Sequence, residues 1–74
     1  MQQEEIKNRL SYNIRVERVK RRWRQAYLAE MANISIKHLS NIENNLTVPS
    51  VHVSYNIAKA FGLKIDDLLR EPEM

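Results

Sequence analysis

The sequence contains no cysteine, one glycine, two prolines and no long apolar run. Without cysteine the chain forms neither a disulfide nor a thiolate metal site, which fits a reducing, cytoplasmic setting. The short apolar runs predict no membrane-spanning segment, and the charged residues within positions 1–10 argue against a signal peptide. Glycine and proline are scarce, and β-branched residues do not alternate with polar ones. These features together predict an all-α fold.

Apolar periodicity and helix-end signals divide the chain into five predicted helices. Every fourth residue is apolar at the start of the chain, at Ile6, Leu10 and Ile14. Residues that favour helix ends stand between the later apolar segments, namely Asn33, Ser35, Ser50 and Gly62. The predicted helices span residues 4–21, 25–32, 36–44, 51–61 and 65–70. We expect one domain over residues 1–70 and a disordered tail over residues 71–74.

The inward-facing side of each predicted helix follows from the same periodicity. Three small or apolar residues share a face of the second helix, namely Leu28, Ala29 and Ala32. The predicted inner stripe of the fourth helix consists of Val51, Tyr55, Ala58 and Phe61.

Charge is distributed unevenly along the chain, although the net charge is only +3. Six basic residues lie between positions 15 and 24, namely Arg15, Arg18, Lys20, Arg21, Arg22 and Arg24. The other end carries Asp66, Asp67, Glu71 and Glu73. A basic end and an acidic end indicate an oriented contact with a polyanion, but a solvated helix face explains the basic cluster as well.

The short connection between the second and third predicted helices is typical of a helix-turn-helix. Only residues 33–35 separate these two short helices. In that motif the second helix enters the DNA major groove, and the first lies across the backbone. The third predicted helix, residues 36–44, is therefore the candidate recognition helix.

Five segments in order resemble the phage-repressor and Cro-like helix-turn-helix family, also called the XRE family. They are IRVER at 14–18, QAYLAE at 25–30, the pattern S-x-x-x-L-S-x-I-E-N at 35–44, PS at 49–50 and IAKAFGLKIDDLL at 57–69. The resemblance implies a compact five-helix bundle of the lambda-repressor-like type. It also implies binding to a double-stranded DNA operator, commonly as a homodimer on a two-fold site.

The resemblance also implies roles for particular residues. The expected base-contacting residues are Ser35, Ile36, Lys37, Ser40 and Asn41. Gln25 matches a residue that contacts phosphate in the family. Basic and polar residues cluster near it, so the expected phosphate-contacting residues are Arg22, Arg24, Gln25, Tyr27 and Asn44. A structural ion pair is expected between Arg18 and Glu43. The family analogy places a dimer surface near Leu63, Ile65 and Leu69, although these side chains can equally be core.

Two departures from the family pattern make the predicted DNA surface more basic. Arg24 stands where serine or threonine usually caps the second helix, and Arg22 replaces the usual glycine after the first. Losing the cap costs about 1 kcal/mol. A phosphate bound there would offset both the missing cap and the added positive charge.

These observations predict a sequence-specific transcriptional regulator, most simply a repressor, at the nucleoid of a prokaryotic cytoplasm. No enzyme, cofactor or metal site is expected, because His38 and His52 have no acidic or cysteine companions at ligand spacing. The alternative is a protein-interaction module on the same fold, such as an antitoxin or an adaptor with a protein partner.

Overall fold

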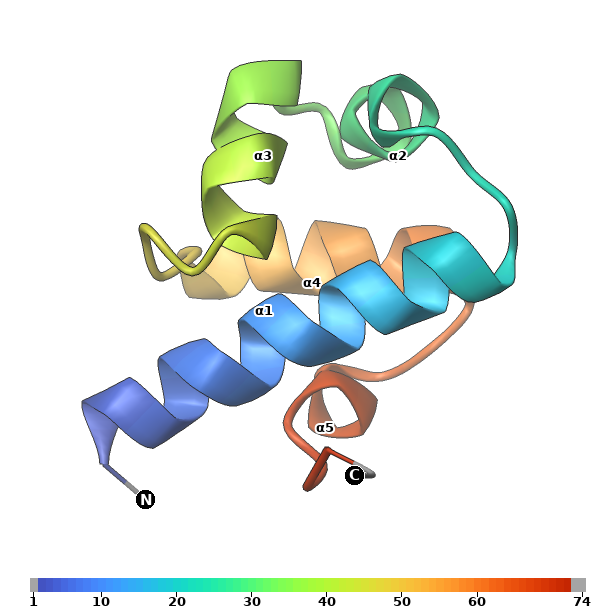
Figure 1. The fold of residues 1–74 in the computed structure, drawn as a ribbon. Coiled ribbons are helices and arrows are strands. Elements are labelled where there is room, and N and C mark those ends of the chain that lie inside the picture. The colour runs from blue at the N-terminus through green and yellow to red at the C-terminus, as the bar shows by residue number, and fades with distance from the viewer. Residues whose placement is uncertain (1, 73–74) are drawn as a thin grey trace.

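The computed structural model describes residues 2–72, and that part of the chain contains five helices and no strand (Figure 1). The helices are α1 (Gln3–Lys20), α2 (Gln25–Ala32), α3 (Ile36–Glu43), α4 (Val51–Phe61) and α5 (Ile65–Leu68). The predicted all-α fold and the order of its helices are confirmed. The bounds of α2 and α4 are as predicted, whereas α3 ends one residue earlier and α5 two residues earlier. Of the tail expected to be disordered, residues 73–74 lie outside the described residues.

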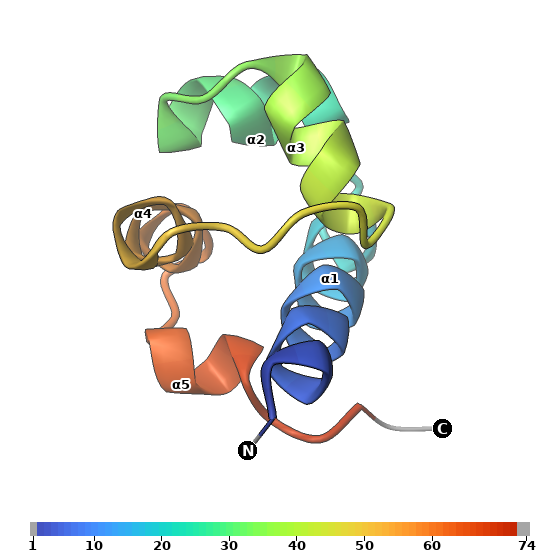
Figure 2. The same ribbon diagram turned by 90° about the vertical axis from the view of Figure 1, so that its left-hand side faces the viewer.

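The helices enclose one apolar core. α2 and α3 lie above α1 and α4, and α5 packs on the opposite side of them (Figures 1 and 2). Every helix contributes buried side chains, and the core consists of Leu10, Ile14, Leu28, Ala29, Ala32, Leu39, Ile42, Ile57, Ala58, Phe61 and Leu68. The predicted inner face of α2 is confirmed, since all three of its residues are in this core. Continuous packing of this kind holds α3 against the rest of the bundle.

The predicted helix ends are confirmed where local side chains set them. The Ser35 Oγ accepts a hydrogen bond from the His38 N–H at 2.9 Å, and the Ser50 Oγ accepts one from the Val53 N–H at 3.1 Å. Asn33 and Gly62 end α2 and α4 in the left-handed conformation, with φ of 60° and 74°. These caps satisfy backbone groups that the helices themselves leave without partners.

Two further non-glycine residues adopt the left-handed conformation. Arg22 has φ of 59° and Asn45 has φ of 63°. Asparagine tolerates this conformation better than most residues, whereas an arginine there is strained relative to glycine. The turn between α1 and α2 therefore keeps Arg22 at a conformational cost.

The predicted inner stripe of α4 was wrong at two positions. Val51 is 78% exposed and Tyr55 is 53% exposed. The buried face instead consists of Ser54, Ile57, Ala58 and Phe61. Ser54 is small and is buried against the neighbouring helices although it is polar. A pattern of apolar residues does not include a serine, so it placed the inward face of α4 on the wrong side at Val51 and Tyr55.

Candidate nucleic-acid interface

The connection between α2 and α3 has the form that the sequence predicts. Asn33 turns the chain in the left-handed conformation, and the Ile34 N–H bonds back to the Ala29 carbonyl at 2.9 Å. Ser35 then caps α3, and Ile34 packs against the apolar core. The three-residue turn is therefore held at both ends, and it places α3 beside α2 as a helix-turn-helix (Figure 1).

The Glu43 carboxylate joins three helices at the end of α3. Its side chain is only 2% exposed, and it accepts two hydrogen bonds from Arg18 of α1, at 2.7 and 2.9 Å. Gln25 of α2 donates a third, at 3.1 Å. Arg18 also donates to the Trp23 carbonyl at 2.7 Å. The expected pair of Arg18 and Glu43 thus has the bidentate geometry of a strong, directional contact, and it couples the orientation of α3 to α1 and α2.

Two residues that the sequence-based assignment missed hold the backbone at the same point. The Ser11 Oγ donates to the Glu43 carbonyl at 2.9 Å, and the Arg15 guanidinium donates to it at 2.8 Å. This carbonyl belongs to the last turn of α3, where no N–H within the helix can reach it. The signal in the sequence is spacing, because Ser11, Arg15 and Arg18 lie on one side of α1 at intervals of four and three.

The expected base-contacting residues lie on the outer side of α3, but they differ in exposure and in the hydrogen bonds that they already make within the protein. Ile36 is 53% exposed, and Lys37 is exposed without an ion pair among the described residues. Asn41 is half-buried, and its amide makes no hydrogen bond within the same residues. The hydroxyl oxygens of Ser35 and Ser40 already accept hydrogen bonds, the first from His38 and the second from Asn44 at 3.3 Å.

The basic cluster divides into engaged and free side chains. Four members bind acceptors within the protein, namely Arg15, Arg18, Lys20 and Arg21. Arg22 and Arg24 are exposed and make no ion pair within residues 2–72. Both come directly before α2, and Arg24, at the N-cap position, supplies no side-chain hydrogen bond to the first N–H groups of that helix. An uncapped, positively charged helix start is a favourable place for a phosphate.

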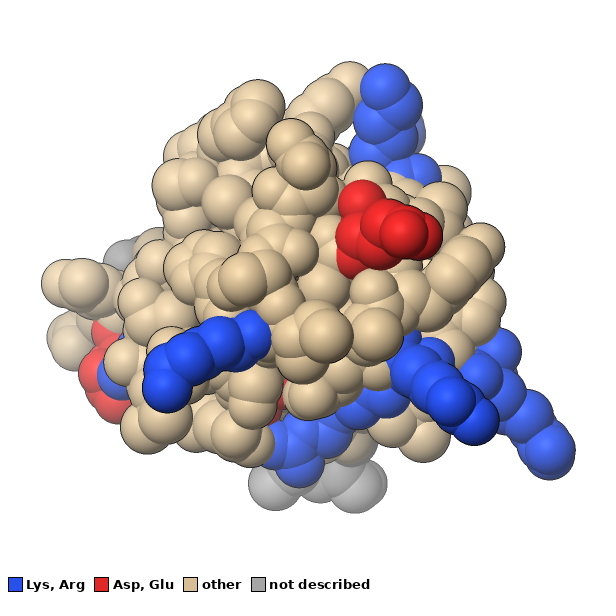
Figure 3. Space-filling model, turned by 90° about the horizontal axis from the view of Figure 1, so that it is seen from above, with Lys and Arg blue, Asp and Glu red and all other residues tan. Residues whose placement is uncertain are grey.

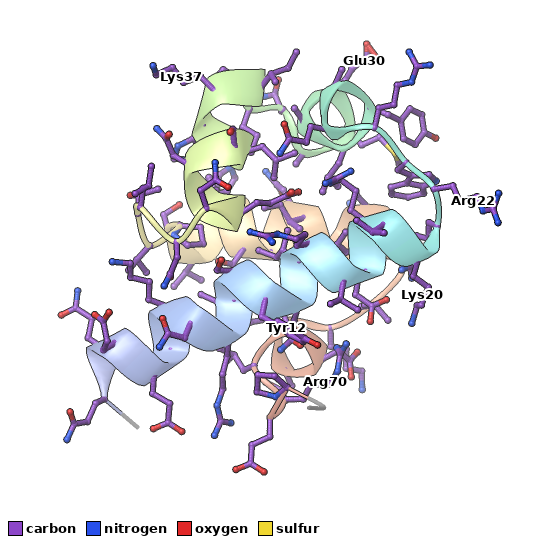
Figure 4. All side chains as sticks on the ribbon, viewed as in Figure 1. Tyr12, Lys20, Arg22, Glu30, Lys37 and Arg70 are labelled. Atoms are coloured by element: carbon purple, nitrogen blue, oxygen red, sulfur yellow. The ribbon has the colours of Figure 1, made fainter. Side chains whose placement is uncertain are left out.

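Figure 3 looks onto the face that carries α2 and α3, where lysine and arginine side chains lie mainly around the rim. Figure 4 shows Lys37 beside the start of α3 and Arg22 on the segment that leads from α1 into α2. An acidic group interrupts the face, and Figure 4 shows Glu30 at the top of α2. Since Glu30 would repel a phosphate, the favourable path for a polyanion runs past the start of α2 and along α3.

Aromatic packing fixes the position of Tyr27 at the start of α2. The Tyr27 ring is 4.9 Å from the Trp23 ring in an edge-on arrangement, and Trp23 in turn stacks on Phe61 at 5.5 Å. The Arg21 guanidinium lies 4.7 Å from the centre of the Phe61 ring. Trp23 is therefore the apolar anchor between α1 and α2, and it supports the exposed Tyr27 beside Arg24.

The buried Glu17 carboxylate explains why two of the cations are engaged. It pairs with Arg21 at 2.6 Å, with Arg70 at 2.7 Å and with Lys20 at 3.2 Å. Burial by itself would raise the pKa of Glu17, but hydrogen bonds from Arg21, Lys20 and Arg70 outweigh it and lower the pKa below its usual value of 4.5. Arg70 follows α5, so this cluster also fastens the end of the bundle to α1.

No helix within residues 2–72 has both the length and the apolar character needed to cross a membrane. No three histidine, cysteine, aspartate or glutamate side chains of that part of the chain gather as metal ligands.

Comparison with known proteins identifies the class to which this fold and surface belong. Residues 14–68 match the family model described as helix-turn-helix. The chain therefore belongs to the helix-turn-helix family, and its resemblance to the XRE group is confirmed. This membership makes it a DNA-binding regulator in the broad sense.

A solved structure supports the same assignment. The chain is similar to the structure titled "Crystal Structure of hypothetical transcription factor NHTF from Neisseria", with a TM-score of 0.85 and 26% sequence identity. The similarity covers 97% of this chain and 84% of that one. None of the curated proteins compared with the chain matches it.

Proposed function

We propose that the protein is a sequence-specific transcriptional regulator, acting as a repressor, that inserts α3 into the major groove of an operator. The exposed side of α3 presents unengaged side chains, and Arg22 and Arg24, on the segment that leads into α2, have no acidic partner within the described residues. The inner side of α3 is meanwhile tied to α1 and α2 through Glu43.

Base recognition is assigned to the outer side of α3. Lys37 can donate to guanine O6 or N7, and the Asn41 amide can pair with adenine N6 and N7. Ile36 offers an apolar contact to a thymine methyl group. Ser35 and Ser40 can each still donate a hydroxyl proton, although their oxygens already accept a bond. These two serines would tolerate several bases.

Phosphate contacts are assigned to residues that border α2 and α3, namely Arg22, Arg24, Gln25, Tyr27 and Asn44. One N–H of the Gln25 amide is committed to Glu43, which leaves its second N–H for a phosphate oxygen. Such contacts orient the domain on the duplex without reading sequence. Gln25 would then connect the bound phosphate directly to the residue that fixes α3.

We further propose that residues 1–70 act as one domain and bind as a homodimer on a two-fold operator. The two α3 helices would lie about 34–36 Å apart, one turn of B-DNA. The protein would act at the nucleoid in the prokaryotic cytoplasm, as a binding protein that needs no cofactor.

A titration of fluorescent random-sequence duplex at two salt concentrations tests the proposal. We expect micromolar or tighter binding at low salt and a steep loss of affinity as salt rises, because bound cations release counterions from the phosphates. Selection of preferred duplexes from a random pool then gives the operator and its symmetry. If no duplex binds at low salt, the proposal is wrong, and an antitoxin or adaptor role becomes the better explanation.

A further inference from the structure

A hollow beside the start of α2 combines aromatic, basic and acidic side chains. Its volume is about 480 Å³, which is within the range of about 300–1,000 Å³ for small-molecule sites. Figure 4 shows two of its residues, Arg22 on the segment that leads into α2 and Glu30 at the top of that helix. We name this hollow the α2 pocket, and its lining consists of Arg22, Trp23, Arg24, Ala26, Tyr27 and Glu30.

Two aromatic rings belong to the lining of the α2 pocket. The Tyr27 ring is 48% exposed, and its plane makes an angle of 74° with the plane of the Trp23 ring. Trp23 is itself held by its stack on Phe61. An exposed ring that is fixed in this way gives a planar base a surface on which to stack, because every nucleobase has a π face.

The charged side chains of the α2 pocket are unpaired within the described part of the chain. Arg22, Arg24 and Glu30 are all exposed, and none of them makes an ion pair there. The two guanidinium groups suit the oxygens of phosphate groups. A carboxylate repels phosphates, so binding to a duplex gives no account of Glu30. The combination of a base-stacking surface, two phosphate-binding cations and one acid calls for a ligand that uses all three.

We infer that the α2 pocket binds a free guanine nucleotide. The Watson–Crick edge of guanine places two N–H donors side by side, at N1 and N2, and the two oxygens of a carboxylate accept from both. Adenine instead presents its N6 donor beside the lone pair of N1, which a carboxylate repels. Glu30 therefore selects guanine. The base stacks on Tyr27, and the phosphates bind Arg22 and Arg24.

Occupation of the pocket would regulate DNA binding, and here the inference rests on the proposed function. Arg22, Arg24 and Tyr27 are the residues that the pocket shares with the proposed duplex contacts. A nucleotide bound to them competes with the operator for the same side chains, so rising nucleotide concentration releases DNA. Within a duplex the Watson–Crick edge of guanine is already paired, so Glu30 distinguishes the nucleotide from the operator.

Tryptophan fluorescence tests the inference without DNA, because Trp23 is the only tryptophan of the chain. Guanosine diphosphate should change the Trp23 emission until the site saturates, and isothermal titration calorimetry should give the same Kd. Adenosine diphosphate should bind at least about tenfold more weakly. Inorganic pyrophosphate, which has the phosphates but no base, should also bind more weakly than guanosine diphosphate.

An unpaired guanine in a single strand offers the same chemistry, so a short thymine strand with one central guanine is titrated as well. Guanosine diphosphate should bind more tightly than this strand, because a diphosphate brings more negative charge to the two arginines than a phosphodiester does. If the strand binds more tightly than both guanosine diphosphate and an all-thymine strand, the pocket belongs to single-stranded nucleic acid, and the free nucleotide is overturned.

Glu30→Gln tests the assigned role of the carboxylate. A glutamine amide both donates and accepts, so it can pair with either purine. The preference for guanosine over adenosine diphosphate should therefore fall about tenfold, mainly because adenosine diphosphate binds more tightly. Removal of a carboxylate that only repels phosphates would instead tighten both nucleotides alike, and that result overturns the inference. Glutamine is a good helix former at this exposed position, so circular dichroism should show native helix content.

Lys59→Ala is the matched control, because it removes an exposed cation of α4 that does not line the α2 pocket. It should bind both nucleotides like the wild-type chain. The inference is also overturned if guanosine diphosphate does not bind or if adenosine diphosphate binds as tightly. Because these titrations contain no DNA, a failure of the proposed function leaves their result unchanged. Where the duplex does bind, guanosine diphosphate should displace it at lower concentration than adenosine diphosphate, and equal displacement would contradict the regulatory role.

Discussion

Replacing Arg18 by methionine should remove a large part of the folding free energy. The substitution leaves the Glu43 carboxylate, 2% exposed, with Gln25 as its remaining side-chain donor. Losing one partner of a buried pair costs about 3–5 kcal/mol, because the other charge stays buried without compensation. A domain of this size is expected to have about 4–11 kcal/mol of stability in total. At the low end of that range Arg18→Met would unfold a substantial fraction of the protein at 25 °C, and at the high end it would show as a lower urea midpoint.

The double variant with Arg18→Met and Glu43→Leu should recover most of that loss. It removes both charges and refills the space with apolar atoms, a replacement that is often neutral for stability. The hydrogen bonds from Ser11 and Arg15 end on the backbone carbonyl of residue 43, so they survive the change of side chain. The coupling between the two positions should reach about 2 kcal/mol or more, within the range for residues in direct contact.

Urea denaturation followed by circular dichroism at pH 7 measures Arg18→Met, Glu43→Leu and the double variant against the wild-type chain. Arg15→Met is the matched control, since it makes the same change on the same helix but removes only one hydrogen bond to a carbonyl. It should lower the unfolding free energy by about 1 kcal/mol. The reasoning fails if Arg18→Met costs no more than this control, or if the single effects of Arg18→Met and Glu43→Leu simply add.

Three further predictions concern DNA contacts and pH. Arg24→Ala should weaken binding to every duplex and flatten the dependence of log affinity on log salt concentration by about one unit. Lys37→Ala should instead lose about 1–3 kcal/mol of discrimination at one base pair. If fluorescence titrations show the same change for both variants, the assignment of Arg24 to phosphate and Lys37 to a base is wrong. Arg22→Gly should relieve the left-handed turn and raise stability by up to about 1 kcal/mol while lowering DNA affinity; unchanged affinity would show that Arg22 contacts no phosphate. The stability that Glu17 contributes should be complete above pH 4.5 and should be lost as the pH falls through its lowered pKa. In a circular dichroism titration toward acid pH, Glu17→Gln should therefore lose helix signal less steeply than the wild-type chain.

Helix ends were predictable because short-range chemistry determines them. Ser35 and Ser50 cap the helices that follow them, and Asn33 and Gly62 end the helices that precede them. Each of these positions depends on a side chain or a φ value within a few residues, so the sequence contains all the information needed. The order of helices and the compact turn between α2 and α3 follow from the same local signals.

Contacts between distant segments were harder to predict. Ser11 and Arg15 meet the Glu43 carbonyl across separations of 32 and 28 residues, and no local pattern marks that target. Tyr55 and Val51 illustrate the opposite error, since an apolar side chain at helical spacing was assigned to the core and is exposed. Hydrophobicity predicts which residues favour burial, but the packing of the neighbouring helices decides which face of α4 is covered.

The basic cluster shows how buried carboxylates determine which charges can reach DNA. As a sequence, its six members look equivalent. In the structure Glu43 binds Arg18, and Glu17 binds Lys20 and Arg21, so these three cations stabilise the bundle. Arg22 and Arg24 follow the last paired residue, and the left-handed turn at Arg22 leads the chain into α2. Within this cluster, the cations left free for a polyanion therefore lie at the start of α2, where phosphate contacts would orient the proposed recognition helix.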